Sequence, residues 1–362
     1  MKRSINFHIY LVTLMIAACS GPVVHAQAAD GLPCADTDTK CARQAALQSA
    51  ARKKSFWAAS MALPLEQRIG PAPAELLRYL TLDNIADGIT NRPRAPNLSA
   101  DLRADIAAAV AELPADIKRA VDRKLAGIYF VSDLGGTGYT DYAKGGWFSR
   151  DAGFVVLDAD VLAGQTANSW ATWKENTPFM PDAAFRLEAI IEEPAADNRK
   201  NAIQYILLHE LGHILSIAET VHPNWDQPPN ADRNLDRYAF ADLSWQIIPS
   251  ENRFASRFDK AFVQRIEVVY YFGAKLAGSA MLPVYEQLEL TNFPTLYAAT
   301  RPGDDFAESF ASYVHTVMMQ RPWQIRIHQH GKLVRSVGAC WQEKRCEPKR
   351  RLLERFLGIG AN

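Results

Sequence analysis

The chain has 362 residues, of which 48% are hydrophobic and 22% are charged, a composition typical of a globular protein with a sizeable core. Lys plus Arg and Asp plus Glu both number 40, so there is no bulk charge that would attract nucleic acid or an anionic membrane surface. The length is compatible with two or three domains, or with one large catalytic domain that carries added helices.

The first thirty residues are typical of a secretory signal. A basic start is followed by an apolar stretch at 9–18 and then by small residues. Two processing sites fit the pattern, because the residues before Cys19 resemble a bacterial lipobox and those before Gln27 resemble an ordinary signal-peptidase site. We therefore predict a signal peptide over residues 1–26 and export from a bacterial cell. The mature protein is expected to be periplasmic, secreted or an outer-membrane lipoprotein, with no transmembrane segment.

Four further cysteines form two close pairs, Cys34 with Cys41 and Cys340 with Cys346. An even number of cysteines in an exported chain favours disulfides. A zinc site made by all four thiolates is the alternative, but the gaps of six and five residues are wider than those of zinc ribbons. We predict that each disulfide staples a terminal segment.

The first part of the mature chain, residues 27–113, is predicted to be a helical extension. Residues 37–91 are rich in Ala, Leu, Arg and Lys and are interrupted by prolines, which indicates short helices broken by turns. Ser99 or Asp101 can cap a helix that ends near Leu113, and a second helix is expected after Pro114. This helical N-terminal extension either shields a cleft as a pro-region or buttresses the rest of the protein, and buttressing is our expectation.

The middle of the chain contains patterns typical of strands. Residues 128–131 and 154–157 are short β-rich runs, and residues 185–192 could form a third strand, although Ala and Glu there also permit a helix. The glycine-rich stretch 133–139 between the first two runs is predicted to be a surface loop. Residues 254–277 have aromatic residues at a spacing that predicts a packed helix.

A metal-binding motif lies at His209-Glu210-Leu211-Gly212-His213. On a helix, residues four apart lie on the same face, so both imidazoles can reach one metal ion while Glu210 points toward the neighbouring coordination position. Zinc suits two imidazoles and one carboxylate, with a fourth place for water. Asn198 or Asp197 can cap this helix.

The best candidate for the third ligand is Glu308, in Asp304-Asp305-Phe306-Ala307-Glu308. Acidic residues suit the first turn of a helix, and apolar residues surround this carboxylate. Asp304 and Asp305 lie about one turn earlier. They are expected either to orient a ligating histidine or to cap the helix.

The two motifs together resemble those of the gluzincin metalloproteases, in particular anthrax-lethal-factor-like and Pro-Pro endopeptidase-like domains. The resemblance implies that zinc is bound by His209, His213 and Glu308 and that Glu210 is the general base. It also implies a tyrosine that stabilises the oxyanion, for which Tyr297 is the best candidate.

Other residues compete for these roles. Tyr313, Arg301 and His222 are alternatives to Tyr297 as the oxyanion donor, and a purely structural tyrosine is a further possibility. His315 lies seven residues after Glu308, but a packing or surface role is favoured for it.

The sequence therefore predicts an α+β protein with a zincin-like catalytic domain, made of a small mixed sheet and an active-site helix, over residues 114–320. A C-terminal extension with a disulfide is expected over residues 321–362. We predict an exported zinc metallopeptidase, an endopeptidase rather than an aminopeptidase, that holds an extended peptide at a sheet edge. The alternatives are a non-catalytic zinc-fold binding protein, which would not need Glu210, and a zinc hydrolase of a non-peptide amide.

Overall fold

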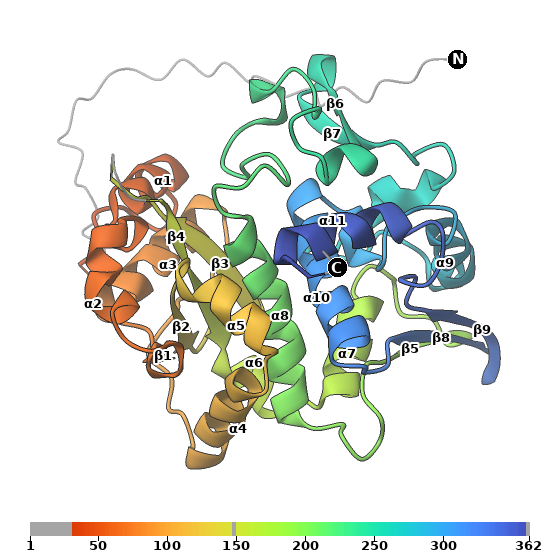
Figure 1. Ribbon diagram of the computed structural model, residues 1–362, viewed down its shortest axis with the longest axis horizontal. Coiled ribbons are helices and arrows are strands. Elements are labelled where there is room, and N and C mark those ends of the chain that lie inside the picture. The colour runs from red at the N-terminus through yellow and green to blue at the C-terminus, as the bar shows by residue number, and fades with distance from the viewer. Residues whose placement is uncertain (1–30, 147–149, 360–362) are drawn as a thin grey trace, which may run out of the picture.

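A computed structural model describes residues 31–146 and 150–359 of the chain (Figure 1). The predicted signal peptide and both processing sites lie outside the described residues. The α+β class is confirmed, because helices alternate with three small sheets.

The largest sheet has the strand order β1-β2-β4-β3. Its strands are β1 (Ile69–Pro71), β2 (Leu125–Val131), β4 (Ala152–Asp158) and β3 (Gly138–Ala143). β1, β2 and β4 are parallel, whereas β3 pairs antiparallel with β4. Within the described residues no other strand pairs with the outer side of β3, so this strand forms an edge of the sheet.

Both faces of this sheet are covered, which explains why its central strands are continuously hydrophobic. Successive side chains of a strand point to opposite faces. Ile128 and Phe130 of β2 face the large core around α8 (Arg199–Ser216), whereas Tyr129 and Val131 face a smaller core. The smaller core is covered by α1 (Thr39–Gln48), α2 (Ala58–Met61) and α3 (Ala74–Ala86) (Figure 1).

The N-terminal extension is built into the same sheet. It supplies strand β1, and the ring of Trp57 packs against those of Tyr129 and Phe154. Arg52 forms ion pairs with Asp141 of β3, at 3.0 Å, and with Asp226, at 2.7 Å. This segment therefore supports the sheet through hydrophobic packing and through buried charge.

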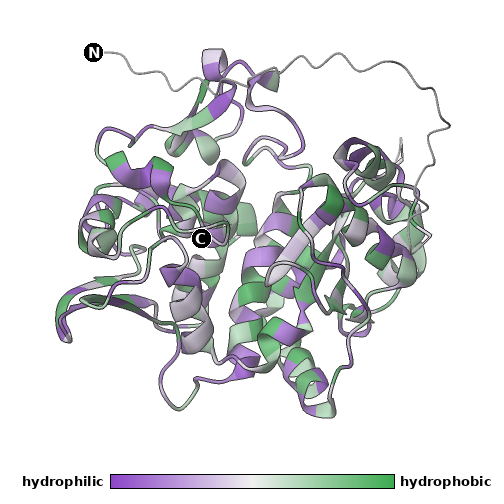
Figure 2. Ribbon diagram, turned by 180° about the vertical axis from the view of Figure 1, so that it is seen from behind, coloured by the Kyte–Doolittle hydropathy of each residue, from purple (hydrophilic) through white to green (hydrophobic). Residues whose placement is uncertain are grey.

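Helix α8 passes through the centre of the molecule beside α10 (Pro302–Tyr313) (Figure 1). Hydrophobic residues, green in Figure 2, gather on the central helix and on the strands beside it, while hydrophilic residues predominate on the loops. Asn198 caps α8 by accepting a hydrogen bond from the backbone of Asn201, as one of the two predicted caps. A Cβ atom at Gly212 would lie 2.8 Å from the Cα of Ala307, so this glycine lets α8 and α10 approach closely.

A second sheet lies on the other side of α10. It contains β5 (Phe185–Ile190), β8 (Gln324–Gln329) and β9 (Lys332–Gly338), all antiparallel, and α7 (Ala167–Asn176) packs against β5. The remaining elements are α4 (Ala100–Ala111), α5 (Ala115–Asp122), α6 (Ala159–Ala163), β6 (Trp245–Ile248), β7 (Arg253–Ser256), α9 (Met281–Leu288) and α11 (Glu347–Leu357).

Most of the predicted elements are confirmed, but two predictions are wrong. Residues 254–277 contain the end of β7, a short 3₁₀ turn and irregular backbone rather than a helix. Phe262 and Tyr270 are nevertheless buried in the large core. The spacing of the aromatic residues therefore indicated that they are buried, but it did not indicate a helix. The glycine-rich stretch 133–139 is a loop only as far as Thr137, because β3 begins at Gly138.

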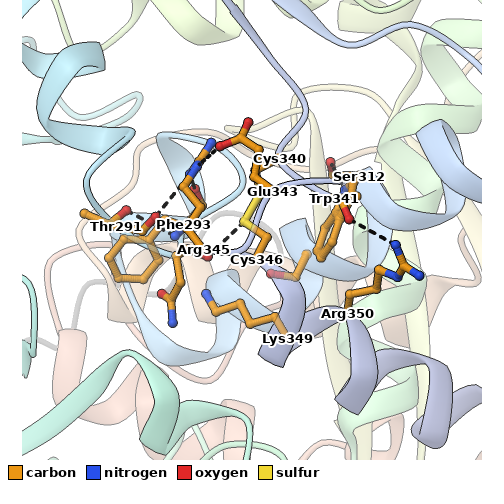
Figure 3. Close-up of a disulfide and its surroundings, with 12 residues drawn as sticks. Thr291, Phe293, Ser312, Cys340, Trp341, Glu343, Arg345, Cys346, Lys349 and Arg350 are labelled. Atoms are coloured by element: carbon orange, nitrogen blue, oxygen red, sulfur yellow. Dashed lines mark hydrogen bonds and ion pairs between the residues drawn. A yellow bond between two sulfur atoms is a disulfide. The ribbon is translucent and has the colours of Figure 1, made fainter.

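The two predicted disulfides, Cys34–Cys41 and Cys340–Cys346, are confirmed and indicate an oxidising, exported environment. In the described part of the chain, no helix combines the length and the apolar character that crossing a bilayer requires. Around the second disulfide, Arg345 donates hydrogen bonds to the carbonyl oxygens of Thr291 and Phe293 (Figure 3). The C-terminal extension is thereby tied to the segment that precedes α10.

A fully buried ion pair fastens α11 to α10. Lys349 donates to Asp305, both side chains are 0% exposed, and Trp245 donates to the other oxygen of Asp305 at 3.0 Å. We expect Lys349→Met to lower the free energy of unfolding by about 3–5 kcal/mol, because it leaves a buried carboxylate without its counter-charge. The charge-balanced variant Lys349→Met with Asp305→Asn should lose much less. Urea denaturation of the four members of this cycle measures the coupling, and purely additive losses would contradict a coupled pair.

Candidate metal centre

The two histidines of the motif project from one face of α8 toward the same point. The Nε2 atoms of His209 and His213 lie 3.2 Å apart, and their rings meet edge to face. Burial and the neighbouring His209 lower the pKa of His213 well below its ordinary value, so its ring is neutral. A neutral imidazole offers a nitrogen lone pair, which is what a metal ligand requires.

Asp304 in the first turn of α10 completes a group of three possible ligands. Its Oδ1 atom lies 3.6 Å from Nε2 of His213, and the ligand atoms of His209, His213 and Asp304 all lie within 4.8 Å of one another. Thr300 donates a hydrogen bond to Oδ2 of Asp304 at 3.0 Å. This bond holds the carboxylate so that Oδ1 faces the imidazoles.

The spacing of these atoms fits zinc. Two ligand atoms at about 2.0–2.1 Å from one tetrahedral ion lie roughly 3.3–3.4 Å apart. The separations of 3.2 Å between the two nitrogens and 3.6 Å between His213 and Asp304 bracket this value. Two imidazoles and one carboxylate also leave one coordination position open, as in catalytic rather than structural zinc sites.

Glu308, the third ligand predicted from the sequence, lies on the opposite side of His209. Its Oε1 atom is 2.9 Å from Nδ1 of His209 and 2.9 Å from Nζ of Lys174, and Thr295 donates to Oε2 at 2.8 Å. Both oxygens of this carboxylate are therefore engaged, and it is only 1% exposed. Asp304 is thus on the side of the two Nε2 atoms, and Glu308 is on the Nδ1 side of His209. The assignment of Glu308 as a metal ligand stays a prediction.

Glu308 makes a short electrostatic contact with Nδ1 of His209, whose geometry is not that of a hydrogen bond. A carboxylate can only accept, so an attractive contact with Nδ1 requires the proton on that nitrogen and leaves the Nε2 lone pair for a metal. Burial alone would raise the pKa of Glu308. The ammonium of Lys174 and the ring of His209 outweigh burial and hold that pKa well below its ordinary value, so Glu308 is ionised.

Glu210, the predicted general base, lies beside the same cluster with a defined orientation. Thr140 of β3 donates a hydrogen bond to its Oε2 atom at 2.6 Å. A Cβ atom at Gly138 would lie 2.5 Å from Oε1 of Glu210, so a larger residue there would displace the carboxylate from this position. Burial raises the pKa of Glu210 above its ordinary value, which makes it a better proton acceptor than an exposed glutamate.

These residues open onto a cleft of about 960 Å³. Edge strand β3 forms one wall, α8 forms the floor, and the segment from Tyr297 to Asp304 forms another wall. The cleft continues to Arg43 and Asp87 on the helices of the N-terminal extension. The extension therefore lines the cleft as well as supporting the sheet.

Tyr297 lies beside His209, in a 3₁₀ turn before α10, and lines the cleft. Its ring centroid is 5.5 Å from that of His209. Among the described residues, its hydroxyl group has no hydrogen-bond partner. Burial raises the pKa of Tyr297 well above its ordinary value, so the phenol keeps its proton and can donate it in a hydrogen bond.

The alternatives to Tyr297 are placed differently. Tyr313 donates to Glu354 at 3.2 Å, and Nδ1 of His222 donates to the carbonyl of Pro223 at 2.7 Å. Arg301 is exposed and lines the cleft. His315 is buried and its Nε2 donates to the carbonyl of Ile191, which confirms the predicted packing role.

Two residues of the centre were not identified from the sequence. Lys174 is an isolated lysine in a helix, 134 residues before Glu308, and nothing in the local sequence marks it. Thr140 directly follows the glycine-rich stretch 133–139 that was predicted to be a loop. An alternating strand pattern after Gly138 was the one available signal for it.

Comparison of the chain with protein-family models, curated proteins and solved structures finds no match.

The ligand geometry leads to a test with metal alone. Asp304→Ala removes a ligand, so we expect it to lower zinc affinity by more than the roughly 10- to 100-fold that loss of an outer hydrogen-bonding partner costs. Glu308→Gln should fall within that range. Zinc affinity is measured by competition with a chromophoric chelator, and circular dichroism checks the fold. The opposite order, with Glu308→Gln abolishing binding and Asp304→Ala retaining it, would restore Glu308 as the ligand.

Proposed function

We propose that the protein is an exported, zinc-dependent endopeptidase whose metal is held by His209, His213 and Asp304. The observation that carries this proposal is the convergence of these three side chains beside Glu210 in an open cleft. A structural zinc site is closed by four protein ligands and needs no general base. The cluster has three ligands and a base, which favours catalysis over a binding role.

Glu210, Thr140 and Tyr297 would have different roles in the hydrolysis. Bound zinc would polarise the carbonyl group and lower the pKa of water. Glu210 takes a proton from the attacking water and delivers it to the leaving amine, while Thr140 keeps its carboxylate in place. Tyr297 donates its free phenolic proton in a hydrogen bond to the negative oxygen that develops on the carbonyl.

The edge strand β3 supports a peptide as the substrate. Among the described residues no strand pairs with the outer side of residues 138–141, which line the cleft next to Glu210, whereas Lys144, just after the strand, is bridged to Lys53. An extended peptide can add to such an edge through backbone hydrogen bonds. A small non-peptide amide would not use this edge. The continuation of the cleft as far as Arg43 leaves room for several residues, which favours cleavage within a chain.

The proposed ligand set and the two disulfides bear on the family resemblance and on the location of the protein. Asp304 in place of Glu308 departs from the gluzincin ligand set, so the gluzincin resemblance rests on the two sequence motifs alone. The two disulfides support export. We propose the bacterial periplasm, the outer membrane or the medium as the site of action.

Substitution of the general base tests the proposal. Glu210→Gln should bind zinc as the wild type does but should cleave peptides about 10²- to 10⁴-fold more slowly, the usual contribution of a general base. Glu219→Gln is a suitable control, because Glu219 follows the same helix and pairs with Lys124 away from the cleft. Cleavage of a peptide library is followed by mass spectrometry, with zinc content measured in parallel. Zinc-loaded wild type that binds peptides without cutting them would indicate a binding protein instead.

A further inference from the structure

Lys174 of α7 is a buried cation behind the metal centre. It is 4% exposed, and its Nζ atom lies 2.9 Å from Oε1 of Glu308 and 3.5 Å from Oε1 of Glu175. The same atom lies 4.7 Å from the centre of the Tyr297 ring, within the range of a cation–π interaction. One ammonium group therefore contacts the carboxylate that orients His209 and the ring of the proposed oxyanion donor.

The contacts of Lys174 explain why Glu308 faces away from the metal position. Glu308 has two oxygen atoms, and Lys174 and His209 share one of them while Thr295 occupies the other. A glutamate four residues after Asp304 is on the same face of α10 and has a longer side chain. Without Lys174, one oxygen of Glu308 would lose its strongest electrostatic partner.

We propose that Lys174 is a positioning residue that selects the carboxylate ligand of the metal. It pins Glu308 against Nδ1 of His209, so that Asp304 is the carboxylate left to bind the ion. This inference rests on the proposed function only in requiring that the site binds a divalent metal.

A neutral hydrogen-bond donor in place of Lys174 would not keep Glu308 in its position beside His209. Burying an ionised carboxylate costs several kcal/mol unless a counter-charge is close. Without Lys174, Glu308 would therefore be expected to turn toward the nearest other cation, which is a metal ion bound by the histidines. The positive charge of Lys174 is thus what makes the metal-distant position of Glu308 favourable.

The surroundings of Lys174 hold it rigidly in this position. Glu175, its second partner, accepts hydrogen bonds from the hydroxyl groups of Tyr270 at 2.8 Å and Tyr285 at 2.9 Å. All three of these residues are buried. Lys174 therefore cannot follow Glu308 if that side chain moves, and the contact is kept only when Glu308 stays beside His209.

The structure offers a matched control on the same helix. Lys349 and Asp305 also form a buried ion pair on α10, but this pair faces α11 and Trp245. Loss of either buried pair should destabilise the fold, whereas only loss of Lys174 should change the metal centre.

The test uses cobalt(II), whose visible spectrum reports its ligands, added to the full-length mature protein. Lys174→Met with Glu175→Gln removes one charge of each sign, so it preserves the balance of buried charge. We expect roughly 10- to 100-fold weaker cobalt affinity and an altered visible spectrum, and we expect Lys174→Met alone to show the same change where it folds. Glu175→Gln alone and Lys349→Met with Asp305→Asn should keep the wild-type spectrum.

The outcomes separate this inference from the proposed function. A wild-type spectrum and affinity in Lys174→Met with Glu175→Gln would overturn the role of Lys174 while leaving the metal site intact. An equal spectral change in Lys349→Met with Asp305→Asn would also overturn it, because the effect would then be a general one of destabilisation. A wild-type protein that binds neither cobalt nor zinc would instead refute the proposed function. Restoration of the original spectrum when Glu308→Gln is added to the Lys174 variant would further support ligand competition by Glu308.

Discussion

The close approach of α8 to α10 is the constraint on which the candidate centre depends. Gly212, in the middle of the motif, removes the one side chain that would hold the two helices apart at Ala307. The histidines of α8 then face the first turn of α10, and Asp304 meets them there. A larger residue at position 212 would displace the carboxylate from both imidazoles, although each helix alone could still form.

The acidic residues of α10 are buried or partly buried and have different partners. Its successive acidic residues serve different partners, since Asp304 faces the histidines, Asp305 faces Lys349 and Glu308 faces Lys174. Buried ion pairs contribute little net stability compared with apolar packing, but the loss of one partner is costly. Each pair therefore matters mainly through the unpaired buried carboxylate that the loss of its partner would leave on α10. The C-terminal extension contributes Lys349, the partner of Asp305, which lies in α11. The disulfide Cys340–Cys346 comes directly before this helix (Figure 3).

Local patterns predicted the parts of the molecule that depend on nearby residues. The motif helix with its Asn198 cap, the strand at 128–131, the strand at 154–157 and both disulfides follow from spacing and composition. The position of Asp304 beside the two imidazoles did not follow, because Asp304 and Glu308 lie on the same face of one helix. Which of the two carboxylates lies on that side depends on tertiary contacts, such as those of Glu308 with Lys174 and Thr295 and that of Gly212 with Ala307. No local pattern contains these contacts.

The edge strand and the buried lysine were missed for related reasons. The glycines near β3 suggested a loop, but Gly138 is needed because the carboxylate of Glu210 occupies the space of a side chain. Lys174 is ordinary in sequence and becomes informative only through partners more than a hundred residues away. In segment 254–277 the sequence pattern was misleading in the opposite direction. The aromatic residues there have helical spacing and some are buried, but the backbone does not form the predicted helix.

The central claim is that two histidines and Asp304 hold a metal ion beside Glu210. A crystal structure of the zinc-loaded protein, with anomalous scattering at the zinc edge, tests it most directly. The account predicts one peak bonded to Nε2 of His209, Nε2 of His213 and a carboxylate oxygen of Asp304, with Glu308 still in contact with Lys174. A peak bonded to Glu308 in place of Asp304, or no zinc between the histidines, would contradict it.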